Sequence, residues 1–224
     1  MPIFVDPYLP RKSPRRIYTL KDGTRVPSVT QIISRFKDSD AIVHWAWQCG
    51  VDGKNYRAER DRAADAGTMA HRAVDAWLHG EEFEFTGNPE VCEKASVAFA
   101  AFLEFARQTN LRVTHSELSL VSEKRRFGGT IDAIVMDEKR AVADWKSSQK
   151  LYPEYLVQVA AYGMLWNENF PEDPVAGGYH LVRFDKTHGD FTHRWWGELE
   201  RAEIAFRYLR ALYELESELK GRIN

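Results

Sequence analysis

The sequence predicts a mixed α/β fold, with a central mixed β-sheet flanked by helices and a helical N-terminal portion. Three observations lead to this prediction. Apolar residues recur at helical spacing between residues 63 and 105, Val- and Ile-rich strand patterns follow between 112 and 146, and helical and strand patterns then alternate to residue 219. No internal repeat or low-complexity linker interrupts the 224 residues. We therefore expect one domain, with a hairpin and helices in residues 1–110 and the sheet core with a last helix in 111–224.

The N-terminal portion is expected to begin with a short hairpin. Residues 18–20 and 24–26 flank the turn Lys21-Asp22-Gly23, and Pro27 ends the second strand. Either Ser28 or Thr30 then caps a helix. Two longer helices follow, and Gly80 ends the first of them. Their buried stripes are Ala63, Gly67, Ala70, Val74 and Trp77 in the first helix, and Val91, Ala95, Ala98, Phe102 and Phe105 in the second.

The C-terminal portion supplies the sheet. Three consecutive strands are expected at residues 112–121, 129–136 and 140–146, followed by a helix after Pro153. Two more strands, at 179–184 and 190–196, flank a turn at residues 187–189. The last helix is expected to bury its apolar positions, which are Ile204, Tyr208, Leu212, Leu215 and Leu219.

Composition excludes several classes of protein. The chain is 44% hydrophobic and 29% charged, as in ordinary globular proteins, and its apolar runs are too short to span a membrane. Its start lacks the pattern of a signal peptide, and two cysteines, Cys49 and Cys92, make neither a disulfide scaffold nor a four-thiolate metal site. We therefore expect a cytoplasmic protein without a membrane partner. The net charge of −2 argues against a surface that is positive throughout.

The most informative segment is the hairpin expected from residues 129–136 and 140–146. Side chains alternate along a strand, so Asp144 and Lys146 share one face. If residues 137–139 form the turn, Met136 lies opposite Arg140, and the same antiparallel register places Asp132 opposite Asp144. Two carboxylates and an amine then converge on one side of the hairpin.

Two interpretations of this cluster remain open from the residues alone. Ionised carboxylates inside apolar strands are costly, and two of them facing each other repel, which a divalent cation such as Mg²⁺ or Mn²⁺ would resolve. The alternative is a buried ion pair between Asp144 and Lys146, with Asp132 hydrogen bonded to the backbone.

Three residues elsewhere favour the metal interpretation. Gln158 and Tyr162 lie four apart on the helix after Pro153 and project from one face, which we expect to lie away from the packing side. His71 lies beside the buried stripe of its helix. Each has a simpler alternative, namely a helix surface for the pair and a boundary residue for the histidine.

Taken together and in this order, these pieces resemble the PD-(D/E)xK nuclease superfamily. The motifs are Gly67-x-x-x-His71, Glu117, Gly129-x-x-Asp132, Asp144-x-Lys146 and Gln158-x-x-x-Tyr162. The segments Asp144-Trp145-Lys146-Ser147-Ser148, 158–162 and 27–30 are similar to the mitochondrial genome maintenance exonucleases and their phage relatives, in the RecB-like branch. The resemblance covers roughly residues 26–165 and implies a restriction-endonuclease-like core.

The resemblance also implies roles for individual residues. It makes four groups the metal ligands: His71, Asp132, Asp144 and the backbone carbonyl of Trp145. Lys146 would act at the attacking water, and Gln158 and Tyr162 would position that lysine or the DNA phosphate. Glu117 would either bind a second metal ion through water or support the hairpin.

Two departures from the family pattern are visible. Iron–sulfur members of the branch need four cysteines, so no cluster is expected here. The proline that precedes the first aspartate in the family is replaced by Ile131. The resemblance therefore implies Mg²⁺ or Mn²⁺ as the cofactor.

Candidate DNA contacts are basic or aromatic. The basic candidates are Lys124, Arg125 and Arg126 before Gly128, and Arg15 and Arg16 near the start. An exposed turn and a flexible tail are equally consistent with them. The aromatic candidates, which can stack on unpaired bases, are Trp45, Trp47 and Tyr56.

The predicted activity is a metal-dependent deoxyribonuclease. Because no sequence-reading motif is present, we expect an exonuclease that acts on single strands or free DNA ends in replication, recombination or repair. A structure-selective endonuclease and a non-catalytic DNA-binding protein are the alternatives. A homo-oligomer, or partner proteins of recombination or replication, would fit the same activity.

Overall fold

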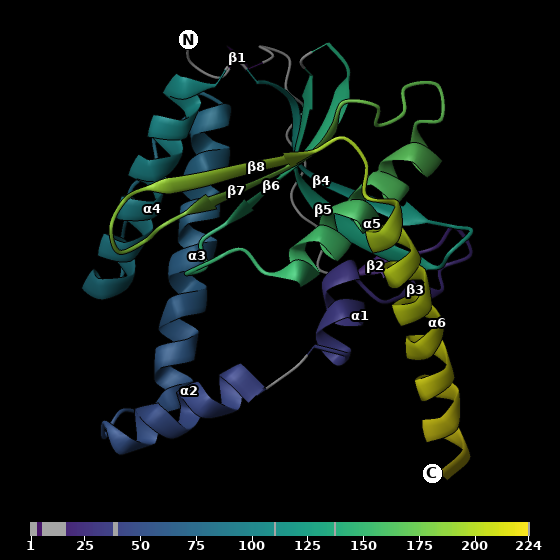
Figure 1. Ribbon diagram of the computed structural model, residues 1–224, viewed down its shortest axis with the longest axis horizontal. Coiled ribbons are helices and arrows are strands. Elements are labelled where there is room, and N and C mark those ends of the chain that lie inside the picture. The colour runs from purple at the N-terminus through teal and green to yellow at the C-terminus, as the bar shows by residue number, and fades with distance from the viewer. Residues whose placement is uncertain (1–3, 6–16, 38–39, 110, 137, 224) are drawn as a thin grey trace.

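The structure, a computed structural model, describes residues 4–5, 17–37, 40–109, 111–136 and 138–223 (Figure 1). A six-stranded sheet has the order β1-β4-β5-β6-β7-β8. Its strands are β1 (Phe4–Val5), β4 (Arg112–Ser122), β5 (Phe127–Met136), β6 (Arg140–Lys146), β7 (Gly178–Phe184) and β8 (Phe191–Trp196). The pairs β1–β4 and β6–β7 are parallel and the others antiparallel, which confirms the predicted mixed sheet.

Helices cover both faces of this sheet (Figure 1). One face packs against α3 (Tyr56–Leu78) and α4 (Pro89–Gln108). The other packs against α1 (Val29–Arg35), α5 (Pro153–Asn169) and α6 (Glu200–Ile223). The helix α2 (Asp40–Val51) lies beyond the sheet, at the lower end of the molecule in Figure 1. This arrangement confirms the predicted fold class.

Local sequence signals explain where the N-terminal elements begin and end. The strands β2 (Tyr18–Thr19) and β3 (Arg25–Val26) form the predicted hairpin. Ser28, rather than Thr30, caps α1, and its hydroxyl and the side chain of Gln31 form a reciprocal capping box. Asn55 and Asn88 cap α3 and α4 by accepting from backbone N–H groups of the first turn. Gly80, at φ 70°, follows the end of α3 as predicted.

The predicted buried stripe of α4 is confirmed in full, and that of α3 in part. Val91, Ala95, Ala98, Phe102 and Phe105 are buried. In α3, Ala70 and Val74 are buried, whereas Ala63, Gly67 and Trp77 are only partly so. The parallel strand β1 was not predicted, because a two-residue strand carries no periodic signal.

Two expectations about the C-terminal helices are wrong. The predicted stripe of α6, which includes Tyr208 and Leu215, is exposed, and the helix instead buries Phe206 against the sheet. A heptad-like stripe indicates an apolar face but does not identify what that face contacts. On α5, Tyr162 faces the sheet rather than lying away from the packing side, because almost the whole second half of this helix is buried.

Among the residues that the structure describes, no helix is long and apolar enough to cross a membrane.

Candidate active site

The β5–β6 hairpin has the predicted register along its inner half. Met136 pairs with Arg140, and the ladder continues to the pair Ala133–Ala143. At the next position a side chain joins the two strands: Oδ2 of Asp132 accepts a hydrogen bond from the backbone N–H of Trp145 at 2.8 Å. The two aspartates therefore lie where the backbone ladder gives way to side-chain contacts.

Glu117 reaches the same place from β4. Its neighbours Ser116 and Leu118 pair with Ala133 and Ile131, so the register places Glu117 across from Asp132. Its backbone has φ 47°, in the left-handed region that residues with a side chain rarely adopt. Such strain persists only where the surrounding structure holds it, and it is commonest at functional sites.

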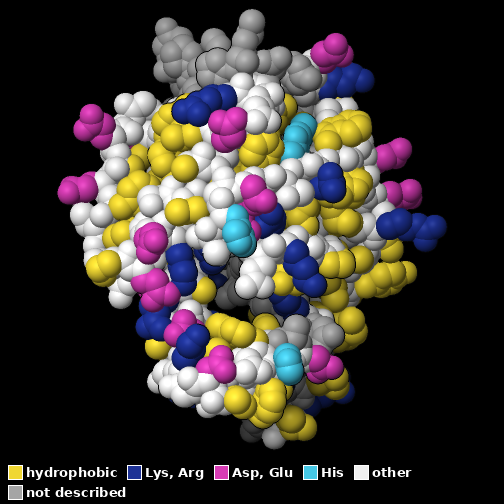
Figure 2. Space-filling model, turned by 60° about the vertical axis from the view of Figure 1, so that its left-hand side comes forward, with side chains coloured by type: hydrophobic (Ala, Val, Ile, Leu, Met, Phe, Trp, Pro, Cys, Tyr) yellow, Lys and Arg dark blue, Asp and Glu magenta, His cyan; other side chains and the backbone are white. Residues whose placement is uncertain are grey.

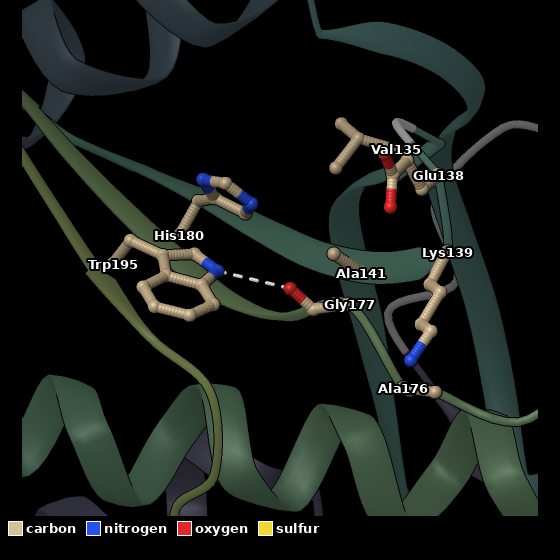
Figure 3. A pocket seen from close by; sticks show the side chains of 8 residues that line it. All are labelled: Val135, Glu138, Lys139, Ala141, Ala176, Gly177, His180 and Trp195. Atoms are coloured by element: carbon tan, nitrogen blue, oxygen red, sulfur yellow. Dashed lines mark hydrogen bonds between the residues drawn. The ribbon is translucent and has the colours of Figure 1, made fainter.

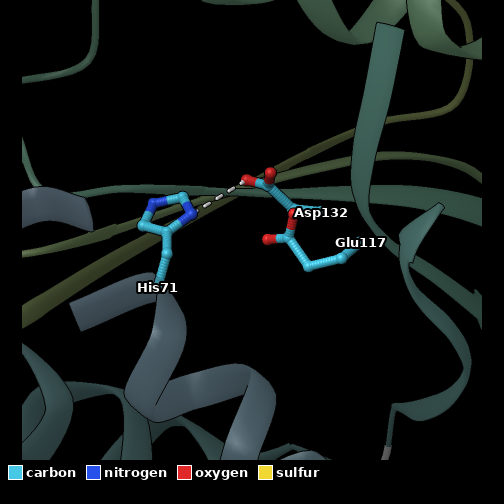
Figure 4. Close-up of side chains that lie close together, drawn as sticks. All are labelled: His71, Glu117 and Asp132. Atoms are coloured by element: carbon cyan, nitrogen blue, oxygen red, sulfur yellow. Dashed lines mark ion pairs between the residues drawn. The ribbon is translucent and has the colours of Figure 1, made fainter. Parts of the chain in front are cut away.

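His71 completes a group of potential metal ligands from the opposite side (Figure 4). One donor atom from each of His71, Glu117 and Asp132 lies within 4.8 Å of the others. The Nδ1 of His71 is 3.8 Å from Oδ2 of Asp132. The helix α3 and the strands β4 and β5 thus bring together three side chains, the first and last of which are 61 residues apart in the sequence.

Gly67 allows α3 to approach the end of β6. A Cβ atom at Gly67 would lie 2.7 Å from Oγ of Ser147, which directly follows Lys146. A side chain at position 67 would require the hydroxyl of Ser147 to turn away or α3 to shift. His71 lies one helical turn further along the same face of α3.

Lys146 lies in a network that joins β6 to α5. Its Nζ is 2.5 Å from Oδ2 of Asp144 and donates to Oε1 of Gln158 at 3.2 Å. The amide of Gln158 in turn approaches Oδ1 of Asp144 at 3.4 Å and donates to the hydroxyl of Tyr162 at 2.8 Å. The four residues that the sequence singled out here form one connected network, and Gln158 is the residue that contacts each of the others.

Burial and mutual repulsion make the carboxyl groups hard to ionise. Burial, and after it the charges of the nearby carboxylates, that of Asp132 first among them, together raise the pKa of Glu117 to about 8. Burial also raises the pKa of Asp144 to about 7, although Lys146 opposes the effect. The pKa of Asp132 is raised by burial as well. Three such groups in one place favour a bound cation.

The pKa values of His71 and Lys146 shift in opposite directions. Burial, and after it the charge of Lys146, lower the pKa of His71 to about 4. The imidazole is therefore neutral near pH 7, which is the form that binds a metal ion. The carboxylates of Asp144 and Asp132 outweigh burial and raise the pKa of Lys146, which holds its proton.

The donor set fits a divalent cation with a preference for oxygen ligands. Glu117 and Asp132 offer carboxylate oxygens and His71 one nitrogen, a mixture that suits Mn²⁺ and is compatible with Mg²⁺. Asp144 is outside this group of three and is engaged by Lys146 instead. The sequence left the role of Glu117 open. In the structure Glu117 is better placed than Asp144 to bind a metal ion together with His71 and Asp132.

Two residues near the site were missed by the sequence reasoning. The Nζ of Lys146 lies 4.8 Å from the centre of the Tyr155 ring, a cation–π contact. The spacing of Tyr155, Gln158 and Tyr162 by three and four residues was a signal that these side chains share one face of a helix. Asp75, one turn after His71, accepts from Ser116 Oγ at 2.7 Å and raises the pKa of Glu117.

The candidate DNA-binding residues lie in three places. Lys124, Arg125 and Arg126 are exposed on the β4–β5 turn, and the guanidinium of Arg125 donates to Glu168 at 3.2 Å. Arg15 and Arg16 lie outside the described residues. On α2, Trp47 is 61% exposed and Trp45 39%, so neither is a core residue.

A separate pocket of about 260 Å³ lies near the other end of the β5–β6 hairpin (Figure 3). Trp195 donates from its indole N–H to the carbonyl of Gly177 at one wall, and His180 lines it nearby. None of the predicted site residues lines this pocket.

Comparisons with known proteins give a loose likeness to solved structures that include two of an exonuclease. No family model and no curated protein sequence matches the chain. A crystal structure of LHK-Exo in complex with dAMP is 16% identical, with a TM-score of 0.43, over 71% of this chain and 87% of that chain. A second structure, described as an alkaline exonuclease (LHK-Exo) from Laribacter hongkongensis, is 16% identical, with a TM-score of 0.37, over 73% and 92%. A likeness of this size is too loose to transfer a function or a residue role.

Proposed function

We propose that this protein is a divalent-metal-dependent deoxyribonuclease that removes nucleotides from DNA ends. One observation carries the proposal: three carboxyl groups with raised pKa values, a neutral histidine and a charged lysine converge where β4, β5 and β6 meet α3 and α5. A purely structural role does not explain why so many buried like charges are placed together.

The side chains divide into two groups around the proposed reaction. His71, Glu117 and Asp132 would hold Mn²⁺ or Mg²⁺, with Asp144 and the carbonyl of Trp145 as further ligands. A metal ion bound there supplies an activated water and offsets the charge that develops on the phosphate oxygens.

Lys146 is proposed to orient and stabilise rather than to remove a proton. Its raised pKa keeps it protonated, so its ammonium group can face a phosphate oxygen or the attacking water. Gln158 would fix the direction of that ammonium group, and Tyr162 would fix Gln158, as their hydrogen bonds indicate.

Single-stranded DNA is the substrate form that the surface favours. Figure 2 shows a hollow between the main body and the lobe at its lower end, with Lys and Arg side chains near its edge. The exposed aromatic residues of α2, of which Trp45 contacts the ring of Tyr56 edge-on at 5.2 Å, offer faces on which unpaired bases can stack. Lys124 and Arg126 would contact phosphates further along the strand. Such an activity would serve replication, recombination or repair.

The test is cleavage of end-labelled linear DNA, single-stranded and duplex, beside a closed circle. Each reaction is run with Mn²⁺, Mg²⁺ or EDTA. We expect metal-dependent loss of the linear single strand, with the circle intact. Lys146→Ala should abolish the loss, whereas Lys139→Ala, an exposed lysine on the β5–β6 turn, should not change it.

Three other outcomes would change the conclusion. Nicking of the circle would indicate a structure-selective endonuclease. DNA binding without cleavage under any metal would indicate a binding protein on the same fold. Equal activity of the Lys146→Ala and wild-type proteins would place the reaction at another site.

A further inference from the structure

Helix α3 and strand β4 are joined by a hydrogen bond next to the candidate metal-binding group. The hydroxyl of Ser116 donates to Oδ1 of Asp75 at 2.7 Å, and Ser116 is only 3% exposed. A hydrogen bond to a carboxylate is stronger than one between neutral groups, and a buried polar group that loses its partner is costly. The bond therefore holds β4 against α3 at the residue that directly precedes Glu117.

At Glu117 the strand β4 exchanges the faces that it presents to the two layers of helices. In a regular strand, residues two apart lie on the same face. Ser116, however, contacts α3, whereas Leu118 packs in the core cluster on the side of α5. Glu117 lies between them with φ 47°, and a left-handed residue interrupts the alternation of side chains along a strand.

The neighbouring strand β5 makes the same exchange at Asp132. Ala133 packs in the core cluster with α3 and α4, whereas Ile131 packs in the cluster with α5. Ser116 pairs with Ala133 and Leu118 with Ile131, so the two interruptions lie side by side. The two carboxylates of the candidate metal-binding group, seen together in Figure 4, therefore belong to the one place where both strands depart from regular alternation.

Asp75 is held in place on α3 and is not itself one of the three potential metal ligands. It lies on the face of α3 that carries His71, one turn further along. Another turn on, Nδ1 of His79 donates to the backbone carbonyl of Asp75 at 2.8 Å and lies 3.4 Å from its Oδ1. One face of α3 thus supplies a potential ligand directly, through His71, and reaches a second, Glu117, through Ser116.

We propose that Asp75 is a positioning residue, which holds Glu117 in its metal-binding conformation through the hydroxyl of Ser116. The inference rests on the proposed function, because that function assigns Glu117 to the metal ion. In this role Asp75 contacts neither the ion nor the DNA. Loss of its hydrogen bond releases β4 beside Glu117, so the carboxylate lies between His71 and Asp132 for less of the time.

The affinity for Mn²⁺, measured by calorimetry without DNA, tests this role separately from cleavage. We expect Ser116→Ala to weaken binding about tenfold, as the loss of a supporting hydrogen bond does at other metal sites. Ser122→Ala is the matched control, because Ser122 is also buried on β4 and donates to a carboxylate, that of Glu168, at 2.6 Å. This control should bind Mn²⁺ normally, although urea unfolding should show that both variants lose stability to a similar extent.

A double-mutant cycle tests whether Asp75 acts through Ser116. Asp75→Ala also removes a negative charge, so it should weaken Mn²⁺ binding more than Ser116→Ala does. In a protein that already carries Ser116→Ala, the further loss should be at least about threefold smaller than in the wild type, because the contact is already broken. If the two losses simply multiplied, Asp75 would act independently, as a charge or as a ligand, and the proposal would be overturned.

A measurement on the metal-free protein separates a failure of this inference from a failure of the proposed function. Hydrogen exchange of residues 115–119 is followed by mass spectrometry in EDTA, and we expect it to be faster in Ser116→Ala than in Ser122→Ala or the wild type. A wild-type protein that binds no Mn²⁺ would contradict the proposed function. Unchanged exchange in Ser116→Ala, or Mn²⁺ binding as tight as that of the wild type, would overturn the positioning role whether or not the protein cleaves DNA.

Discussion

The two halves of the β5–β6 hairpin differ in the chemistry of their buried side chains and in how the two strands contact each other. Near the turn, pairs such as Ile134–Val142 are apolar, fully buried and joined by a regular backbone ladder. Beyond the pair Ala133–Ala143, the same two strands carry Asp132, Asp144 and Lys146. There the contacts are made by side chains, and the carboxyl pKa values are raised by burial.

The difference separates stability from chemistry along a single hairpin. The apolar half gains free energy by burial and rigid packing. The polar half buries like charges, which costs stability in the metal-free protein and would favour the proposed binding of a cation. Substitutions in the two halves should therefore affect different measurements.

The largest expected effect is on the reaction, in the polar half. Asp132→Asn retains an oxygen that can accept from the N–H of Trp145 but removes the charge that would hold the metal ion. We expect the rate of cleavage to fall by about a hundredfold or more, as when other electrostatic groups of active sites are removed. Single-turnover cleavage of labelled DNA at saturating protein measures this. A fall of less than about threefold, or roughly 0.6 kcal/mol, would contradict it.

The next effect is on stability, in the apolar half. Ile134→Ala leaves a cavity among fully buried neighbours and should cost about 2–5 kcal/mol in the free energy of unfolding. Urea unfolding of the metal-free protein measures it. Asp132→Asn should leave that free energy unchanged or raise it, because one buried like charge is lost. If both substitutions destabilised the protein equally, the two halves would not differ as described.

The pH dependence of metal binding sharpens the comparison. Because the pKa of Glu117 is raised to about 8 from its ordinary 4.5, its contribution to stability is present at low pH and lost as pH rises through 8. Metal binding requires the ionised form, so the gain in melting temperature from Mn²⁺ over EDTA should be larger at pH 8.5 than at pH 6. Glu117→Gln should reduce this difference. An equal or larger gain at pH 6 would count against the assignment.

The close approach of α3 to β6 gives a smaller effect. Gly67→Ala brings a Cβ atom to 2.7 Å from Oγ of Ser147, so that hydroxyl must turn away or α3, and His71 with it, must shift. We expect metal affinity, measured by calorimetry, to fall about tenfold, or roughly 1.4 kcal/mol. Gly50→Ala on α2, where an added Cβ meets nothing within 4 Å, is the matched control and should bind normally.

The most local effect concerns Tyr155. Tyr155→Phe keeps the ring beside Lys146 and should leave kcat unchanged, whereas Tyr155→Leu removes the cation–π contact. A contact of this kind is worth about 0.5–2 kcal/mol, so kcat should fall roughly two- to thirtyfold. Equal losses in both variants would indicate that the hydroxyl, not the ring, matters.

Much of this arrangement could be predicted from the sequence, because alternation along strands fixes which residues share a face. The register from Met136–Arg140 to Ala133–Ala143 followed from the turn length alone. The helix stripe of α4 followed from its spacing. The association of Gln158 and Tyr162 with Lys146 was implied only by the family resemblance, and the spacing wrongly placed Tyr162 away from the packing side.

The remainder depends on tertiary contacts that periodicity does not encode. The left-handed backbone of Glu117 is imposed by neighbouring strands, so its place beside His71 and Asp132 could not be derived locally. The stripe of α6 was correctly identified as apolar but wrongly assigned to the core. Two apolar faces compete on that helix, and only packing decides that Phe206 points inward.

Crystals soaked in Mn²⁺ test the proposed metal centre most directly, through anomalous diffraction. A manganese peak is expected between His71, Glu117 and Asp132, within about 2.0–2.4 Å of an atom from each. It should be absent from Asp132→Asn crystals soaked in the same way. A peak elsewhere with this group empty, or none in the wild-type protein, would contradict the account.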